Sequence, residues 1–438
     1  MKRFRWVSEK LLIALLIPCI APSGFPDIFS SDIDAFKLTR SDKIVKALEI
    51  DFSGNGYPDL LCIVENSYFI VINHKDPDYF KYGNRNSLIP QTELSQDFYS
   101  QKYAIMPPLS SQEGSSQNDS LILVADGGKM EVIRYLNDSE VSIWNRYLVY
   151  PYTLIPRESD PVNLFSRIFH IGFGEFTKYS KYRKNDLFLV TYDGIQYRLI
   201  LFKKPFQDLD RSARNISPTL LFDLPAKPSR LWFGDIEKDE KHKDDIFFEY
   251  EENRAWHIWI ADPSLDQYSH SFQYPVPEGA LQVQDILSIQ AEYDLLVSVK
   301  SQPESDIAYV AFKKESIPLD QEIYIFVPVT IPGKHLQGAV TRLFSYENKN
   351  TGESYPIAMV YNQLDPQNPQ PNPIYIYRID PVNPLSPQLV QTFIPEYIIG
   401  DELFYFDRPE VVADFDQDGI SDLMLMAFST QPDTSVFR

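Results

Sequence analysis

The sequence contains little cysteine, which limits how the chain can be stabilised. Cys19 and Cys62 are its only cysteines. Cys19 lies in an apolar segment near the N-terminus, so removal of that segment on export would leave one cysteine and no internal disulfide. Cys62 lies in the apolar run LLCIV, where we expect a small buried hydrophobic side chain rather than a reactive thiol. These counts exclude the disulfide-stabilised class of exported domains.

Histidine is also scarce, and the common catalytic motifs are missing. The six histidines are scattered without the spacing of a metal-binding pair. The sequence has no G-x-S-x-G elbow, P-loop, dinucleotide fingerprint or sialidase-type Asp box. These absences favour a protein that is not an enzyme. An active site assembled from distant loops stays open, because no local motif would mark it.

Long hydrophobic runs are rare. The run at residues 11–20 is short for a membrane helix and is interrupted by Pro18. Basic residues precede it and small residues follow at 21–23, which is the pattern of an export signal. We therefore expect a signal peptide at residues 1–23 and a single exported domain at 24–438, periplasmic, on the cell surface or secreted. Membrane association is expected only if Cys19 is lipidated, for which the preceding proline is a poor context.

Positive charge is in deficit, since the formal net charge is −20. The electric field of a strongly negative protein repels nucleic acid and anionic lipid and attracts cations. No nucleic-acid partner is expected. Most of these charges are expected to serve solubility alone.

Glycine is sparse and proline abundant, at 17 and 33 residues, so the turns rely on Pro, Asn and Asp. Short runs of Val, Ile, Tyr, Phe and Trp lie between these turns, and no convincing long amphipathic helix follows residue 23. Aromatic residues make up 14% of the chain; most are expected to fill space between sheets, and some could bind a glycan or protein. The pattern predicts an all-β fold.

One pattern, a polar residue followed by a short apolar run, recurs about every sixty residues. The seven units start at Asp59, Asp119, Asp186, Asp245, Asp294, Pro356 and Asp422, and Pro356 replaces the aspartate of the other six. A long period with several strands per unit predicts a seven-bladed β-propeller. The last unit is short, so we expect an N-terminal strand, from about residues 27–38, to complete the last blade and close the ring.

Acidic loops precede the first and last of these runs. In ADFDQDGISDLMLMAF, residues 413–428, four aspartates and a glycine have the spacing that turns oxygen ligands toward one Ca²⁺. The expected ligands are Asp414, Asp416, Asp418, Asp422 and the carbonyl of Ile420. Leu425 replaces the glutamate that an EF-hand needs at position 12, so that class is excluded.

The loop in DFSGNGYPDLLCIV, residues 51–64, offers fewer charged ligands, and its affinity should be lower. Its expected ligands are Asp51, Ser53, Asn55, Asp59 and the carbonyl of Tyr57. An Asx-rich turn without metal is the alternative. In the loop at 235–245, lysines lie among the acids, so we expect a salt-bridged loop there rather than a metal site.

The two loops and the strands after them resemble the FG-GAP/VCBS repeats, which also form the propeller head of integrin α subunits. The resemblance rests on residues 51–61 and 414–424. Weaker matches to the Phe-Gly dipeptide of the repeat occur at Phe173-Gly174 and Phe233-Gly234. It implies a seven-bladed propeller with Ca²⁺ in some loops between first and second strands. It also implies extracytoplasmic binding more often than chemistry.

These observations favour an exported, calcium-stabilised propeller that binds a protein or carbohydrate ligand through one face. One rival is a polysaccharide-cleaving hydrolase or lyase with its site in the propeller funnel. Another is a structural component of the cell envelope. No residue in the sequence names a ligand.

Overall fold

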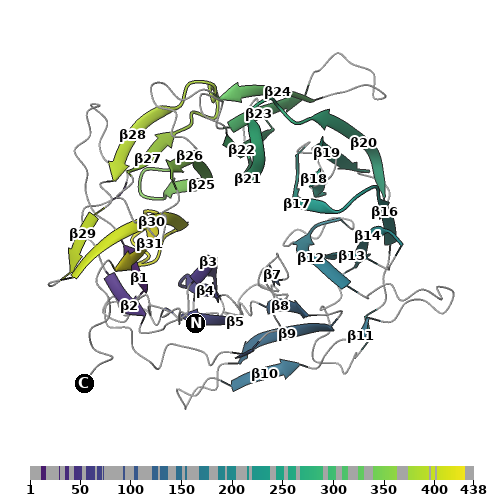
Figure 1. Ribbon diagram of the computed structural model, residues 1–438, viewed down its shortest axis with the longest axis horizontal. Coiled ribbons are helices and arrows are strands. Elements are labelled where there is room, and N and C mark those ends of the chain that lie inside the picture. The colour runs from purple at the N-terminus through teal and green to yellow at the C-terminus, as the bar shows by residue number, and fades with distance from the viewer. Residues whose placement is uncertain are drawn as a thin grey trace, which may run out of the picture.

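The computed structural model describes the chain in segments (Figure 1). The described residues are 11–15, 29, 35–38, 44–51, 56–64, 67–71, 73, 92–93, 103–106, 121–126, 129–136, 145–149, 153–154, 167–176, 186–192, 195–203, 215–216, 220–236, 243–250, 255–262, 267–289, 294–301, 308–313, 324–329, 339–362, 373–393, 396–399 and 402–429. Every regular element in these segments is a β-strand, so the all-β prediction is confirmed. Within them, no helix is long and apolar enough to cross a membrane.

Most strands belong to seven sheets, numbered here in chain order. Sheet 1 contains β3 (Ile44–Ile50), β4 (Asp59–Val64), β5 (Ser67–Val71) and β6 (Thr92–Glu93). Sheet 2 contains β7 (Tyr103–Met106), β8 (Leu121–Asp126), β9 (Lys129–Leu136) and β10 (Asn145–Val149). Sheet 3 contains β12 (Arg167–Gly174), β13 (Asp186–Tyr192), β14 (Tyr197–Phe202) and β16 (Leu220–Leu224). A separate parallel pair joins β11 (Thr153–Leu154) to β15 (Asn215–Ile216).

The later sheets follow the same plan. Sheet 4 contains β17 (Pro228–Gly234), β18 (Asp245–Tyr250), β19 (Ala255–Ala261) and β20 (Tyr268–Pro275). Sheet 5 contains β21 (Ala280–Ser288), β22 (Leu295–Ser301), β23 (Ala308–Lys313) and β24 (Tyr324–Val329). Sheet 6 contains β25 (Val340–Asn348), β26 (Glu353–Tyr361), β27 (Ile374–Arg378) and β28 (Gln388–Phe393). Sheet 7 joins β29 (Glu396–Ile399), β30 (Glu402–Ala413) and β31 (Asp422–Ser429) to the N-terminal strands β1 (Leu11–Leu15) and β2 (Ala35–Leu38).

The sheets stand around a common centre in chain order, and the innermost strand is the first strand in sheets 1 to 6 and β30 in sheet 7 (Figure 1). Sheets 1 to 6 are antiparallel meanders in which each strand pairs with the next strand of the same sheet. Neighbouring innermost strands lie side by side: β3 with β30, β30 with β25, β25 with β21, β21 with β17, β17 with β12, and β12 with β7. The architecture is β-propeller-like.

The repeated aspartate of the sequence starts the second strand in several sheets, and its carboxylate holds the preceding loop. In four sheets it lies opposite the last residue of the first strand, in the registers Ile50–Asp59, Gly174–Asp186, Gly234–Asp245 and Ala413–Asp422. Three of these carboxylates accept a loop N–H, from Phe176 to Asp186 at 2.9 Å, Ile236 to Asp245 at 2.8 Å and Phe415 to Asp422 at 3.0 Å. The repeat therefore marks a local hydrogen-bonding device as well as a strand start.

Aromatic side chains fill the space between neighbouring sheets. Trp256 of sheet 4 is fully buried, and its ring lies 5.7 Å from Tyr309 and 5.0 Å from Phe326 of sheet 5, both edge-on. Phe188 of sheet 3 packs 4.4 Å from Phe233 of sheet 4. Burial of such large apolar surfaces is the main favourable term that holds the sheets together.

Cys62 is a buried residue of β4, as expected. Burial in an apolar sheet raises the pKa of its thiol, which makes the reactive thiolate less accessible.

Polar side chains also bond one inner strand to the next. The Nε2 of His170 in β12 donates to the Pro228 carbonyl of β17 at 2.9 Å. The Arg230 guanidinium donates to the Val283 carbonyl of β21 at 3.1 Å. The Leu343 N–H of β25 donates to Asp285 at 3.2 Å. Such bonds satisfy buried backbone groups where sheets meet and fix how neighbouring sheets are aligned.

Sheet 7 is completed by N-terminal strands. β31 pairs directly with β1, and β1 pairs with β2. The segment expected to complete this sheet, residues 27–38, thus contributes β2, but β1 lies between it and β31. β1 falls inside the expected signal peptide, 1–23, and cleavage of that peptide stays a prediction.

Candidate metal centre and adjoining pocket

The loop between β30 and β31 gathers three of the predicted carboxylates. Asp414, Asp416 and Asp422 each offer an oxygen, and these atoms lie within 4.8 Å of one another. The tight path depends on positive φ angles of 60° at Gln417 and 90° at Gly419. At Gly419 an added Cβ would also lie 3.0 Å from Oδ1 of Asn350, so glycine suits both the turn and the close approach.

Backbone N–H groups satisfy only part of this oxygen cluster. Asp414 Oδ2 accepts the Gly419 N–H at 3.2 Å, and Asp422 accepts the Phe415 N–H. Asp416 Oδ1 accepts the Asp418 N–H at 3.0 Å. Asp414 Oδ1, however, is buried without a hydrogen-bond partner. A buried carboxylate oxygen is costly to leave unpaired, so this atom is open to a further ligand.

The electrostatics of the loop favour a bound cation. Burial, followed by repulsion from Asp416, Asp418 and Asp414, raises the pKa of Asp422 to about 7. Burial is also the main cause of the raised pKa of Asp416. The nearby cation is Lys349, whose Nζ lies 3.5 Å from Asp414 Oδ2. A hard oxygen donor set with an unpaired buried oxygen fits Ca²⁺.

Asp418 and Ile420 occupy other places in the loop. The Asp418 side chain is exposed, and its Oδ1 accepts the Ile420 N–H at 2.7 Å. Ile420 also forms an isolated backbone bridge with Asn348 of the neighbouring sheet. Asp418 is therefore not one of the three converging carboxylates, and metal ligation by it or by the Ile420 carbonyl stays a prediction.

The first acidic loop is described only in part. Ser53 and Asn55 lie outside the described residues. Asp51 Oδ1 accepts the Gly56 N–H at 3.4 Å, and buried Asp59 accepts the Asn73 N–H at 2.7 Å. Tyr57 is half-buried. Both the metal site expected here and its metal-free alternative stay predictions.

The third acidic loop, 235–245, has its residues 237–242 outside the described part of the chain. Asp245 accepts the Ile236 and Ala261 N–H groups at 2.8 and 2.9 Å. The Lys243 ammonium donates to the Asp262 carbonyl at 2.9 Å. Both residues are buried. Their bonds hold the loop to its own sheet.

The 414–422 loop contacts both neighbouring sheets. Toward sheet 1, the Gln417 amide donates to the Gly56 carbonyl, and the Asn73 side chain donates to the Phe415 carbonyl at 2.8 Å. Toward sheet 6, the Lys349 N–H donates to the Gly419 carbonyl at 2.7 Å. The loop therefore joins the last sheet to both the first and the sixth. Sequence reasoning did not find these contacts, because each partner is far away in the chain and no local motif marks it.

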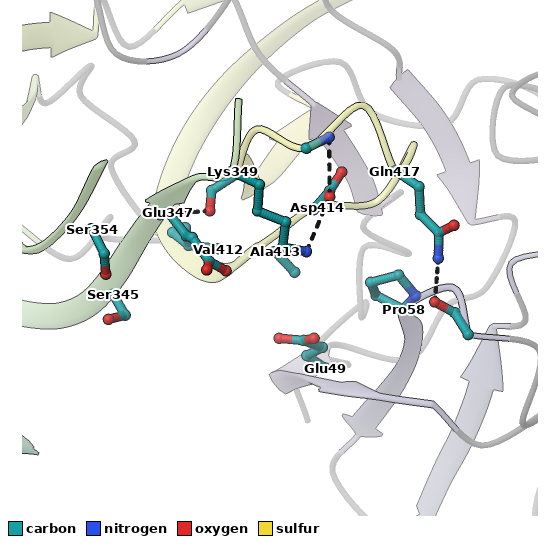
Figure 2. A pocket seen from close by; sticks show the side chains of 13 residues that line it. Glu49, Pro58, Ser345, Glu347, Lys349, Ser354, Val412, Ala413, Asp414 and Gln417 are labelled. Atoms are coloured by element: carbon teal, nitrogen blue, oxygen red, sulfur yellow. Dashed lines mark hydrogen bonds and ion pairs between the residues drawn. The ribbon is translucent and has the colours of Figure 1, made fainter. Parts of the chain in front are cut away.

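A pocket of about 710 Å³ lies where these three sheets meet. Its wall comes from Glu49 of β3, the turn at 56–58, the β25–β26 hairpin, and the end of β30 with its following loop. Figure 2 shows Glu49, Glu347, Lys349 and Asp414 around this space, with Gln417 beside Pro58. Partial loss of water raises the pKa of Glu49, while the nearby Lys349 ammonium acts in the opposite direction.

His257 and His170 have structural surroundings. The His257 ring packs edge-on against Tyr250 at 4.6 Å, and burial lowers its pKa. His170 bonds to a backbone carbonyl of the next sheet, as described above. Neither belongs to a group of converging metal ligands within the described residues.

Comparisons with known proteins give a fold likeness at low similarity. No family model matches the chain, and no curated protein matches it. Among solved structures, it is similar to BBS1N crystallised in complex with ARL6DN, with 11% identity and a TM-score of 0.44 over 86% of this chain and 91% of that one. It is similar to a putative 6-phosphogluconolactonase from Bacteroides uniformis, with 10% identity and a TM-score of 0.42 over 88% and 96% of the two chains. An exo-β-1,3-galactanase from Phanerochaete chrysosporium shares 12% identity and a TM-score of 0.32 over 70% and 64%. These likenesses are too distant to assign a family or an activity.

Proposed function

We propose that this protein is an exported, calcium-stabilised seven-bladed β-propeller of the FG-GAP/VCBS type that acts as a binding scaffold for a protein or carbohydrate ligand. The observation that carries the proposal is the convergence of Asp414, Asp416 and Asp422, together with the buried Oδ1 of Asp414, which has no hydrogen-bond partner. Carboxylates this close repel one another unless a cation lies between them.

Ring closure is supported by contacts between the last sheet and the first. Glu410 of β30 accepts the Ala47 N–H of β3 at 3.1 Å. Arg408 pairs with both Glu410 and Asp407 in the same buried group. The Glu410 contact to Ala47 and the Gln417 contact to Gly56 link sheets 7 and 1 at two levels. Seven blades that close in this way would leave only short strand edges exposed.

In this proposal Asp414, Asp416 and Asp422 hold the ion. A bound Ca²⁺ supplies positive charge that relieves the repulsion among these carboxylates. The chain's own residues do the rest: Gly419 allows the turn, and Gln417 and Lys349 carry the ordered loop to the two neighbouring sheets. The ion thus has a structural role, fixing the loop that joins three sheets.

Calorimetric titration of the chelator-treated protein with Ca²⁺ tests the proposal. We expect binding with Kd of about 0.1 mM, the range of extracellular calcium modules. Binding should be lost in Asp416→Asn, because the substitution removes one of the three converging carboxylates. The Asp416 side chain is exposed, so its replacement should leave the fold intact. Unchanged calcium binding in Asp416→Asn, or no binding by the parent protein, would contradict the proposal. Glu353→Gln, an exposed substitution outside the loop, is the control and should bind as the parent does.

A further inference from the structure

The pocket between sheets 1, 6 and 7 carries more negative than positive charge. Glu49, Glu347 and Asp414 line it, and Lys349 is the cation among its described lining residues. The Lys349 ammonium already pairs with Asp414. No hydrogen bond or ion pair joins the carboxylate of Glu49 or Glu347 to another described residue, so these two acids are available to a ligand.

The size of the pocket and the placement of its acids argue against a single metal ion as the occupant. Glu49 belongs to sheet 1 and Glu347 to sheet 6. Neither joins the one group of converging carboxylates found among the described residues. A volume of about 710 Å³ is the size of a small-molecule site. A cation with several N–H donors suits a pocket whose acids come from different sheets.

The remaining lining is polar and has no aromatic side chain among the described residues. Pro58, Val412 and Ala413 are its apolar members, while Ser345 and Ser354 add hydroxyl groups. The described lining therefore has no ring on which a sugar or nucleobase could stack. Hydroxyl and carboxylate oxygens accept hydrogen bonds, and an ammonium or guanidinium group offers only donors.

We propose that this pocket binds a basic side chain, a lysine ammonium or an arginine guanidinium, presented by a protein partner, with Glu49 and Glu347 as its counter-ions. The inference rests on the proposed binding function and names the chemistry of the ligand. Both acids are exposed, and they line the pocket together with the turn at 56–58 and the loop after β30 (Figure 2). A partner that covers these segments can supply the contact area that a free small molecule lacks.

Lys349 sets the selectivity of the pocket, because its ammonium competes with an incoming cation for the same acids. It neutralises Asp414 and lowers the effective negative charge near Glu49. Removal of this charge should therefore strengthen binding of a basic ligand. A merely structural role for Lys349 would predict no gain in affinity.

The test is calorimetry on the full chain in saturating Ca²⁺ with three probes. These are acetyl-Gly-Lys-Gly-amide, the same peptide acetylated on the lysine side chain, and spermidine. We expect the lysine peptide to bind with Kd below about 10 mM and the neutral peptide not to bind. Glu49→Gln or Glu347→Gln should weaken binding about threefold, and the double variant about tenfold. Lys349→Gln should tighten it about twofold.

Glu353→Gln is the matched control, because Glu353 is an exposed acid of the same β25–β26 hairpin that does not line the pocket. It should bind as the parent does. Equal binding of the neutral peptide, full binding by the double variant, or no binding of the lysine peptide would overturn the inference. Binding of spermidine alone, lost in the double variant, would identify a free polyamine and overturn the assignment to a protein side chain.

The calcium response separates failure of this inference from failure of the proposed function. Each variant is also melted with and without Ca²⁺. A retained calcium shift with no lysine binding overturns the pocket assignment alone. Loss of the calcium shift in the parent protein overturns the proposed function itself. The melting temperature also shows that each variant is folded.

Discussion

Replacement of Asp422 by asparagine separates the electrostatic role of the last acidic loop from its hydrogen-bonding role. Asparagine keeps an oxygen that can accept the Phe415 N–H, but it carries no charge. The raised pKa, about 7 against the usual 3.8, means that the ionised carboxylate destabilises the metal-free fold. Each pKa unit corresponds to about 1.4 kcal/mol. The rise in pKa from 3.8 to about 7 therefore sets an upper bound of about 4 kcal/mol on this destabilisation. Solvent screening reduces the expected destabilisation to about 2 kcal/mol.

In chelator at pH 8, Asp422→Asn should therefore be as stable as the parent protein or more stable, by up to about 2 kcal/mol. In Ca²⁺ the parent should gain stability and the variant should not. At 1 mM Ca²⁺ with Kd of about 0.1 mM, the gain is RT ln 11, about 1.4 kcal/mol. Urea denaturation with and without Ca²⁺ measures both quantities.

Asp186→Asn is the matched control, because Asp186 occupies the equivalent place in sheet 3 and accepts the Phe176 N–H. It is fully buried and lies outside the converging carboxylate group. Its replacement puts an amide N–H2 group in this fully buried place, which should cost about 1–3 kcal/mol in both conditions and leave the calcium gain intact. The reasoning is refuted if Asp422→Asn behaves like this control, with the same loss in both conditions and a retained calcium gain.

Three further predictions concern other parts of the fold. Glu410→Ala should lower the free energy of unfolding by about 3 kcal/mol, because it leaves the Arg408 charge buried with one partner fewer; a loss below about 1 kcal/mol in urea denaturation would contradict it. Gly419→Ala should cost about 1–2 kcal/mol at its φ of 90° and weaken calcium binding; Gly352→Ala, at a φ of 75° with open space around it, should lose stability without the calcium effect. Burial lowers the pKa of His257, so the stability that its neutral ring contributes is full above pH 6.5 and is lost as pH falls. The free energy of unfolding of His257→Gln should therefore fall less between pH 7.5 and 5.5 than that of the parent. An equal fall in both proteins would contradict this pH dependence.

The sequence predicted the order of strands well because each sheet repeats one local pattern. An aspartate followed by an apolar run predicts a second strand, and β4, β13, β18 and β31 start at such residues. The aspartate is needed locally, since its carboxylate accepts a nearby loop N–H in sheets 3, 4 and 7. Alternation and turn residues then suffice to predict the strands that follow.

The contacts between sheets could not be predicted in the same way. Gln417 reaches Gly56, and Asn73 reaches Phe415, across most of the chain length. Their positions depend on how the first and last sheets meet, which no local pattern encodes. The insertion of β1 between β31 and β2 has the same origin. The apolar run at 11–15 has the composition of both an export signal and a strand; it pairs as a strand here, and its removal on export stays a prediction.

The candidate metal site was predictable as a ligand set but not as a geometry. The spacing of the aspartates identified Asp414, Asp416 and Asp422, which converge. It gave Asp418 the same role, yet this side chain turns back to the Ile420 N–H at the exposed tip of the loop. The pocket was not predicted, because its acids come from three different sheets.

The most direct test of the account is an X-ray structure of the protein grown with Ca²⁺ and measured at a wavelength that enhances anomalous scattering from calcium. The account predicts an anomalous peak bound by Asp414, Asp416 and Asp422, with Gln417 still joined to Gly56. A loop without such a peak, in which Lys349 remains the cation beside Asp414, would contradict it.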